Sequence, residues 1–131
     1  MQDKEIRSIL IEYLNIKHKE YRIYQEKSIG SSICDLMLVT DKLTGFEIKS
    51  DRDNYERLAK QVSAYNQFFD ENYIVVGATH AKSIESKIPA EWGILAISSY
   101  NVELVRSAKL NKFVDRKKQL SILWKIELKN L

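Results

Sequence analysis

Two carboxylates and a lysine are the residues of this 131-residue chain whose spacing best suits catalysis. Glu47 and Lys49 stand two apart in the strand-like segment "FEIK", and Asp35 is the single charge in the apolar segment "ICDLMLV". Alternation along a strand places Glu47 and Lys49 on one face, and a hairpin between the two segments brings Asp35 to the same point. We therefore expect the three side chains to converge.

The chemistry that this trio suits is hydrolysis of a phosphodiester. Two carboxylates held close together repel each other, and a divalent cation relieves that repulsion. Oxygen ligands of this kind suit Mg²⁺ or Mn²⁺, which would activate water while Lys49 neutralises charge on the phosphate. The alternative is a plain salt bridge at a sheet edge, because Glu-x-Lys recurs at Glu85 to Lys87 and at Glu127 to Lys129.

The elements that must position these residues predict an α/β fold in a single domain over 1–131. Apolar spacing of three and four predicts helices over 3–15, 53–69, 81–88 and 116–131, the second capped by Asp53. Alternating or continuous apolar runs predict strands over 20–26, 33–39, 46–49, 72–78, 92–97 and 101–107. The last helix is expected to bury the stripe Leu120, Leu123, Trp124 and Leu128.

Composition excludes a membrane-spanning protein and favours the cytoplasm. No apolar run approaches the roughly 20 residues that a spanning helix needs, and the charged N-terminus does not resemble a signal peptide. The net charge is only +3, but residues 106–118 hold six basic residues and one acid, a local +5. A basic segment beside a cluster of acids suits a metal site that receives a polyanion, and a solvated charged surface is the alternative.

A longer pattern carries a family resemblance. The segment "GFEIKSDRDNYERLAKQVSAYNQFFDENYIVVG", followed by "IPAEWGI" and "LWKIEL", resembles the PD-(D/E)xK nuclease superfamily. Within it the chain looks like a family of small stand-alone bacterial and phage proteins with the pattern EIKSDxDxxERLxxQxxxY. The resemblance implies a restriction-endonuclease-like core of order αβββαβ, with a central mixed sheet of four to six strands flanked by helices.

The resemblance also implies a set of site residues. It assigns metal binding to Asp35, Glu47 and the backbone carbonyl of Ile48, and the catalytic lysine role to Lys49. Related nucleases often add a glutamate, for which Glu26 is the first choice and Glu12 the second. On the helix, Gln61 and Tyr65 match the Gln-x-x-x-Tyr of the superfamily, and Gln61 would hold a metal-bound water or a phosphate.

The function predicted from these features is a Mg²⁺- or Mn²⁺-dependent endonuclease, with DNA as the expected substrate and weak or structure-dependent specificity. Its predicted nucleic-acid contacts are Arg52, Arg57, Tyr65, Lys117 and Lys118, although either arginine serves equally well as a partner for nearby acids. Dimerisation or a partner protein is expected to help it act on two strands. The alternative is a catalytically weak binding protein on the same fold, either a phage-borne inhibitor or a nucleic-acid-binding subunit.

Overall fold

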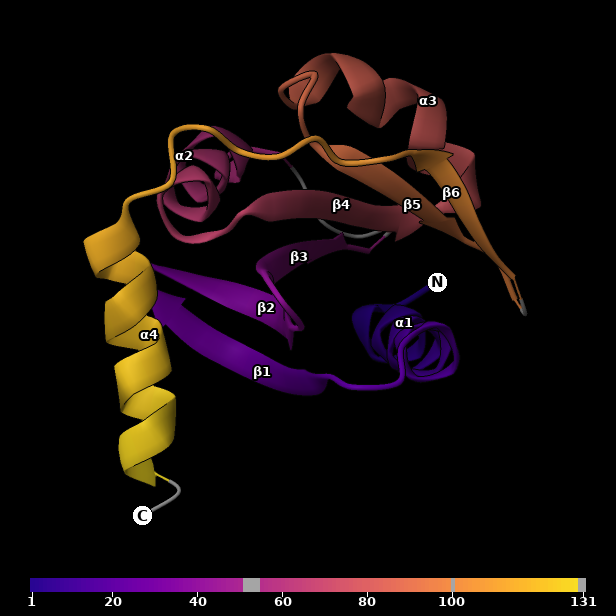
Figure 1. Cartoon of the computed structure of the whole chain (residues 1–131). Helices are drawn as coiled ribbons and strands as arrows, with labels where there is room; N and C mark the ends of the chain where they lie inside the picture. The colour runs from indigo at the N-terminus through magenta and orange to yellow at the C-terminus, as the bar shows by residue number, and fades with distance from the viewer. Residues whose placement is uncertain (51–54, 100, 130–131) are drawn as a thin grey trace.

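The chain folds around one mixed six-stranded sheet, which confirms the predicted α/β class (Figure 1). The computed structural model describes residues 1–50, 55–99 and 101–129. Its elements in chain order are α1 (Asp3–Lys17), β1 (Arg22–Ile29), β2 (Ser32–Val39), β3 (Leu43–Lys49), α2 (Leu58–Phe68), β4 (Glu71–Gly77), α3 (Ala81–Ile84), β5 (Gly93–Ile97), β6 (Val102–Arg106) and α4 (Arg116–Lys129). Short 3₁₀ turns flank α3 at Ala78–His80 and Glu85–Lys87.

The strands lie in the sheet in their chain order, β1 to β6. Antiparallel hairpins join β1, β2 and β3, the α2 crossover makes β4 parallel to β3, β5 is parallel to β4, and β6 returns antiparallel. The central strand β3 is buried along its whole length, because it is covered on both faces. This strand carries Glu47 and Lys49, so both charges lie inside the protein.

The two faces of the sheet carry separate cores. Helix α1 covers one face, where Ile6, Leu10 and Leu14 pack with Phe46 and Ile48. Helices α2, α3 and α4 lie on the side of the other core, in which Tyr65, Phe69 and Trp92 are buried (Figure 1). Alternation in β3 therefore directs Glu47 toward α2 and its neighbours Phe46 and Ile48 toward α1.

A glycine sets how closely α2 approaches the sheet. A Cβ on Gly45 would stand 2.5 Å from Cδ2 of Phe69, a ring with no exposed surface. The missing side chain thus lets the end of α2 lie directly on β3, and this seats the helix over the carboxylate-bearing strands.

Two helix predictions need correction. Helix α2 begins at Leu58, with Arg57 at its N-cap, and the predicted cap Asp53 lies outside the described residues. Helix α4 buries Ile122 and Ile126, whereas the predicted stripe is exposed at Leu120, Leu123 and Trp124. Both stripes have helical spacing, so periodicity alone does not decide which one meets the sheet. None of the described helices is long and apolar enough to cross a membrane.

Candidate functional site

The candidate site lies where strands β2 and β3 separate. Their ladder ends at the pair Leu36 and Phe46, and Asp35 and Glu47 are the next residues on either side. Oδ2 of Asp35 accepts a hydrogen bond of 2.8 Å from the backbone N–H of Ile48. The two predicted carboxylates thus lie close together. The carboxylate of Asp35 also satisfies a backbone N–H that the β2–β3 ladder leaves without a strand partner.

Tyr65 closes the same gap from α2. Its hydroxyl accepts from the backbone N–H of Asp35 and lies 3.1 Å from two acceptors, Oε2 of Glu47 and the carbonyl of Phe46. Burial raises the pKa of the Tyr65 hydroxyl, which therefore stays protonated. Tyr65 has no exposed surface, so the predicted contact with nucleic acid is wrong and its role is internal.

The carboxylate pair holds a proton at neutral pH. Burial, together with the charge of Asp35, raises the pKa of Glu47 from its ordinary 4.5 to about 8. Burial also raises the pKa of Asp35, although its hydrogen bond from Ile48 opposes that rise. Nζ of Lys49 stands 4.0 Å from Oε1 of Glu47, so a cation already faces the pair from the same strand.

A second cation, Arg7, reaches the pair from α1. Its guanidinium lies 3.8 Å from Oδ1 of Asp35 and donates to the carbonyl of Asp35 at 3.0 Å. The same group pairs with Oε1 of Glu26 at 3.0 Å and with Asp3 at 3.2 Å. Arg7 was not predicted, because nothing in a helix pattern marks a contact with a residue 28 positions further along the chain.

A hollow of about 330 Å³ opens beside this pair. The residues that line it come from β1, the following turn, β2, β3 and the N-terminal end of α2 with its cap. They are Glu26, Ser31, Ser32, Ile33, Asp35, Glu47, Arg57, Lys60 and Gln61. Within the described part of the chain, the buried Oε1 of Gln61 has no hydrogen-bond partner. The hollow therefore gathers five of the predicted site residues, Glu26, Asp35, Glu47, Arg57 and Gln61. It also has a lysine, Lys60, that was not predicted.

Glu26 is the strained member of this set. Its φ of 55° lies in the left-handed region, which is unfavourable for a residue with a side chain. The β1–β2 register pairs Gln25 with Leu36 and Lys27 with Cys34, so Glu26 stands across from Asp35. The strain thus falls at the point where the third carboxylate approaches the pair.

The remaining predicted residues lie elsewhere. Glu12 is exposed on α1 and does not line the hollow, and Arg52 is outside the described residues. Lys117 and Lys118 stand in the first turn of α4, where Oδ1 of Asp115 accepts from both backbone N–H groups. The side chain of Lys118 donates to Gln67. Lys117 and Lys118 thus lie away from the carboxylate hollow, whereas the predicted basic residue Arg57 lines it.

Two carboxylate side chains, Asp35 and Glu47, are the ligands that the described residues offer to the predicted metal ion. Paired carboxylates suit a divalent ion, yet across 1–50, 55–99 and 101–129 no three Asp, Glu, His or Cys side chains gather closely enough to hold one. Lys49 and Arg7 already supply positive charge to the pair. A proton on the pair and these two cations can therefore balance its charge.

Comparison with known proteins identifies the family. The model of the family "Bacteriophage P4 protein cII" matches residues 1–131. "Protein cII" of Enterobacteria phage P4 is 28% identical over 143 aligned positions, which cover all of this chain and 53% of the phage protein. This chain thus spans about half the length of that relative. A solved protein of unknown function from Silicibacter pomeroyi is 19% identical, with a TM-score of 0.77 over 99% of this chain and 87% of that one.

These findings contradict the nuclease prediction. The family that matches along the whole chain is the phage protein, not the PD-(D/E)xK nuclease superfamily, and the similar solved structure has no known function. The predicted hydrolase activity is therefore wrong as a main assignment. The carboxylates and the lysine of the motif do meet in space, but the family that the chain matches is the phage protein. The alternative of a phage-borne binding protein agrees better with that family.

Proposed function

We propose, from the premise that this chain belongs to the bacteriophage P4 protein cII family, that it binds nucleic acid without cutting it. The protein would then be the nucleic-acid-binding protein expected as the alternative to a nuclease, and it would act in the cytoplasm. The order α1, β1 to β3, α2, β4 supports a restriction-endonuclease-like arrangement of the core. This arrangement concerns the fold and implies no nuclease activity. DNA is the expected nucleic acid.

The observation that carries this proposal is a pair of exposed lysines on one surface. Lys109 and Lys112 line the same cavity and, among the described residues, make no ion pair or side-chain hydrogen bond. By contrast, Arg106 is held by two backbone carbonyls, and Arg116 pairs with Asp70 at 2.7 Å. Lysines that serve no internal contact remain available to phosphates, whose counterions they release on binding.

The carboxylate pocket has a structural role in this proposal. Asp35 and Tyr65 satisfy backbone groups at the separation of β2 and β3, and Glu47 shares their hydrogen-bond network. A pair that keeps a proton at pH 7 does not repel its own strands. These hydrogen bonds thus give Asp35, Glu47 and Tyr65 a structural role that requires no catalysis.

Binding of Mg²⁺ or Mn²⁺ at Asp35 and Glu47 stays a prediction. A cation there has to displace the proton of the pair, so its affinity should rise between pH 6 and pH 8. Titration calorimetry with MgCl₂ at both pH values checks this, with Asp35→Asn as the control. If no heat of binding is observed at pH 6 or at pH 8, the predicted metal site is wrong.

The proposed function is tested by salt-dependent binding. Fluorescence anisotropy with labelled single-stranded DNA should show an affinity that falls as salt rises, and the double variant Lys109→Ala/Lys112→Ala should reduce the log–log slope by about 1.4. Lys19→Ala, an exposed lysine in the turn after α1, serves as the matched control and should leave the slope unchanged. Equal slopes for all three proteins would overturn the assignment of this surface.

The predicted homodimer has one surface that supports it. The exposed residues Leu120 and Trp124 share a stripe of α4 with Lys117 and Glu127, at steps of three and four. If two copies of α4 pair antiparallel, Leu120 of one copy lies opposite Trp124 of the other, and Lys117 lies opposite Glu127. In this arrangement apolar side chains face apolar side chains, and each lysine faces a glutamate.

This pairing is tested by charge exchange. Sedimentation equilibrium should show a dimer that Lys117→Glu dissociates, because glutamates would then face each other across the pair. The double variant Lys117→Glu/Glu127→Lys should restore it. A monomer at all concentrations, or a dimer indifferent to both variants, would exclude this arrangement.

A further inference from the structure

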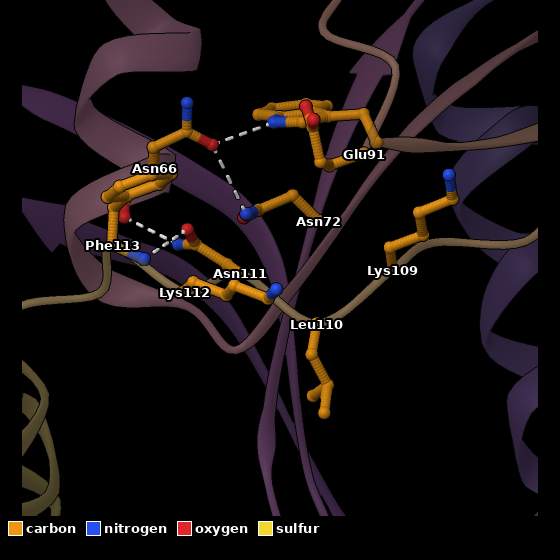
Figure 2. A pocket seen from close by; sticks show the side chains of 9 residues that line it. Asn66, Asn72, Glu91, Lys109, Leu110, Asn111, Lys112 and Phe113 are labelled. Carbon is orange, nitrogen blue, oxygen red and sulfur yellow. Dashed lines mark hydrogen bonds between the residues drawn. The ribbon is translucent and has the colours of Figure 1, made fainter.

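A second cavity lies at the C-terminal end of α2, whereas the carboxylate pocket lies at its N-terminal end. Figure 2 shows this second cavity from close by. Its volume is about 410 Å³, within the range of small-molecule sites. Its walls are formed by the end of α2, the start of β4, the turn before β5 and the segment between β6 and α4. The lining residues are Asn66, Asn72, Glu91, Trp92, Lys109, Leu110, Asn111, Lys112 and Phe113.

The wall of this cavity contains an unsatisfied buried acceptor. Asn72 is only 2% exposed, and its Oδ1 has no hydrogen-bond partner among the described residues. Oδ1 of Asn66 sets the orientation of the amide, since it lies 3.5 Å from Nδ2 of Asn72 and also accepts from Nε1 of Trp92 at 2.8 Å. Because an unpaired buried acceptor is destabilising, a ligand that offers an N–H donor would be favoured here.

The mouth of the cavity displays an aromatic ring on a fixed segment. Phe113 is 87% exposed, and its neighbour Leu110 is 63% exposed. The segment is held in place because Nδ2 of Asn111 donates to the carbonyls of Asn66 and Phe69 at 2.6 and 2.9 Å. A ring that contributes nothing to the core, yet is presented by a well-bonded segment, is pre-organised to stack on a planar group.

Charged side chains beside the cavity indicate which charge the ligand carries. Lys109 and Lys112 extend beside the cavity, and neither has an ion-pair partner within the described chain (Figure 2). Glu91 lies on the same wall and disfavours a second negative group there. The set therefore suits a planar ring with an N–H donor that is attached to one phosphate.

We infer that this cavity binds one unstacked nucleotide of a single strand. The base stacks on Phe113 and donates to Oδ1 of Asn72, while its phosphate lies between Lys109 and Lys112. Trp92 is 1% exposed and forms the wall beneath, without stacking on the base. The inference rests on the proposed function, because it specifies how the bound strand is held.

The test compares two labelled single strands of equal length and phosphate number, one with every base and one with abasic residues. The wild-type protein should bind the complete strand roughly tenfold more tightly, within the range measured for one stacked base. Phe113→Ala should abolish this preference and leave the affinity for the abasic strand unchanged. Phe113→Tyr, which retains the ring, should keep the preference, and Asn72→Leu should reduce it.

Each other outcome overturns a defined part of the account. Equal affinity of the wild-type protein for the two strands, or a preference that survives Phe113→Ala, excludes the nucleotide pocket and leaves nucleic-acid binding intact. Failure of both strands to bind at low salt excludes the proposed function together with the pocket. Phe113 is exposed, so its variants should have unchanged thermal midpoints, and this control separates loss of binding from loss of folding.

Discussion

Replacing Glu47 by glutamine should remove most of the pH dependence of folding stability between pH 5 and pH 8. The pKa of Glu47 is about 8 in the folded protein and 4.5 ordinarily, so the folded state binds the proton more tightly. The stabilisation is complete below pH 4.5, where it amounts to roughly 5 kcal/mol, and is lost as the pH rises through 8. Between pH 5 and pH 8 the wild-type free energy of unfolding should fall by roughly 3 to 4 kcal/mol.

The assay is urea denaturation followed by circular dichroism at pH 5, 6, 7 and 8. In Glu47→Gln the free energy of unfolding should change little across this range. Asp35, whose pKa is also raised by burial, contributes in the same direction as Glu47 in the wild-type protein. His18 works in the opposite direction, because burial lowers its pKa and its contribution rises with pH. Its effect is common to both proteins and cancels in their difference.

The matched control is Glu20→Gln, an exposed glutamate in the turn before β1. This variant should keep the wild-type pH dependence. A wild-type free energy of unfolding that is equal at pH 5 and pH 8 would refute the reasoning. So would an undiminished fall in Glu47→Gln, because the proton would then reside on another group.

Three further substitutions test the packing around the two cavities. Tyr65→Phe leaves the backbone N–H of Asp35 without an acceptor and should lower the free energy of unfolding by roughly 1 to 3 kcal/mol in urea denaturation; an unchanged midpoint would contradict the network. Gly45→Ala should cost about 1 to 3 kcal/mol in the same assay, because the new Cβ meets the ring of Phe69, and a neutral result would show that α2 shifts freely. Asn111→Ala should accelerate hydrogen exchange between β6 and α4 at least tenfold, and unchanged protection would mean that its two bonds do not fix this segment.

The geometry of the carboxylate cluster could be predicted because it depends on local rules. Alternation in β3 places Glu47 and Lys49 on one face, and the β2–β3 hairpin brings Asp35 beside them. Both rules act within 15 residues of the chain. The function assigned to the cluster did not follow, because a proton, Lys49 and Arg7 can balance the pair Asp35 and Glu47 without a metal ion.

The features that the sequence did not reveal depend on tertiary packing. Arg7 reaches Asp35 because α1 packs on the sheet and brings the two side chains together. Helix α4 has two apolar stripes, and the one with the larger side chains, including Trp124, is exposed while Ile122 and Ile126 are buried. The left-handed φ of Glu26 leaves no mark in its neighbours along the chain. Each outcome depends on how elements meet, which local patterns do not encode.

The central claim is that this member of the phage family binds nucleic acid and leaves it intact. The most direct measurement is anisotropy of a labelled single-stranded DNA titrated with the wild-type protein in Mg²⁺, followed by electrophoresis of the same samples. The account predicts binding that weakens with salt and a strand of unchanged length. No rise in anisotropy at low salt, or a shortened strand, would contradict it.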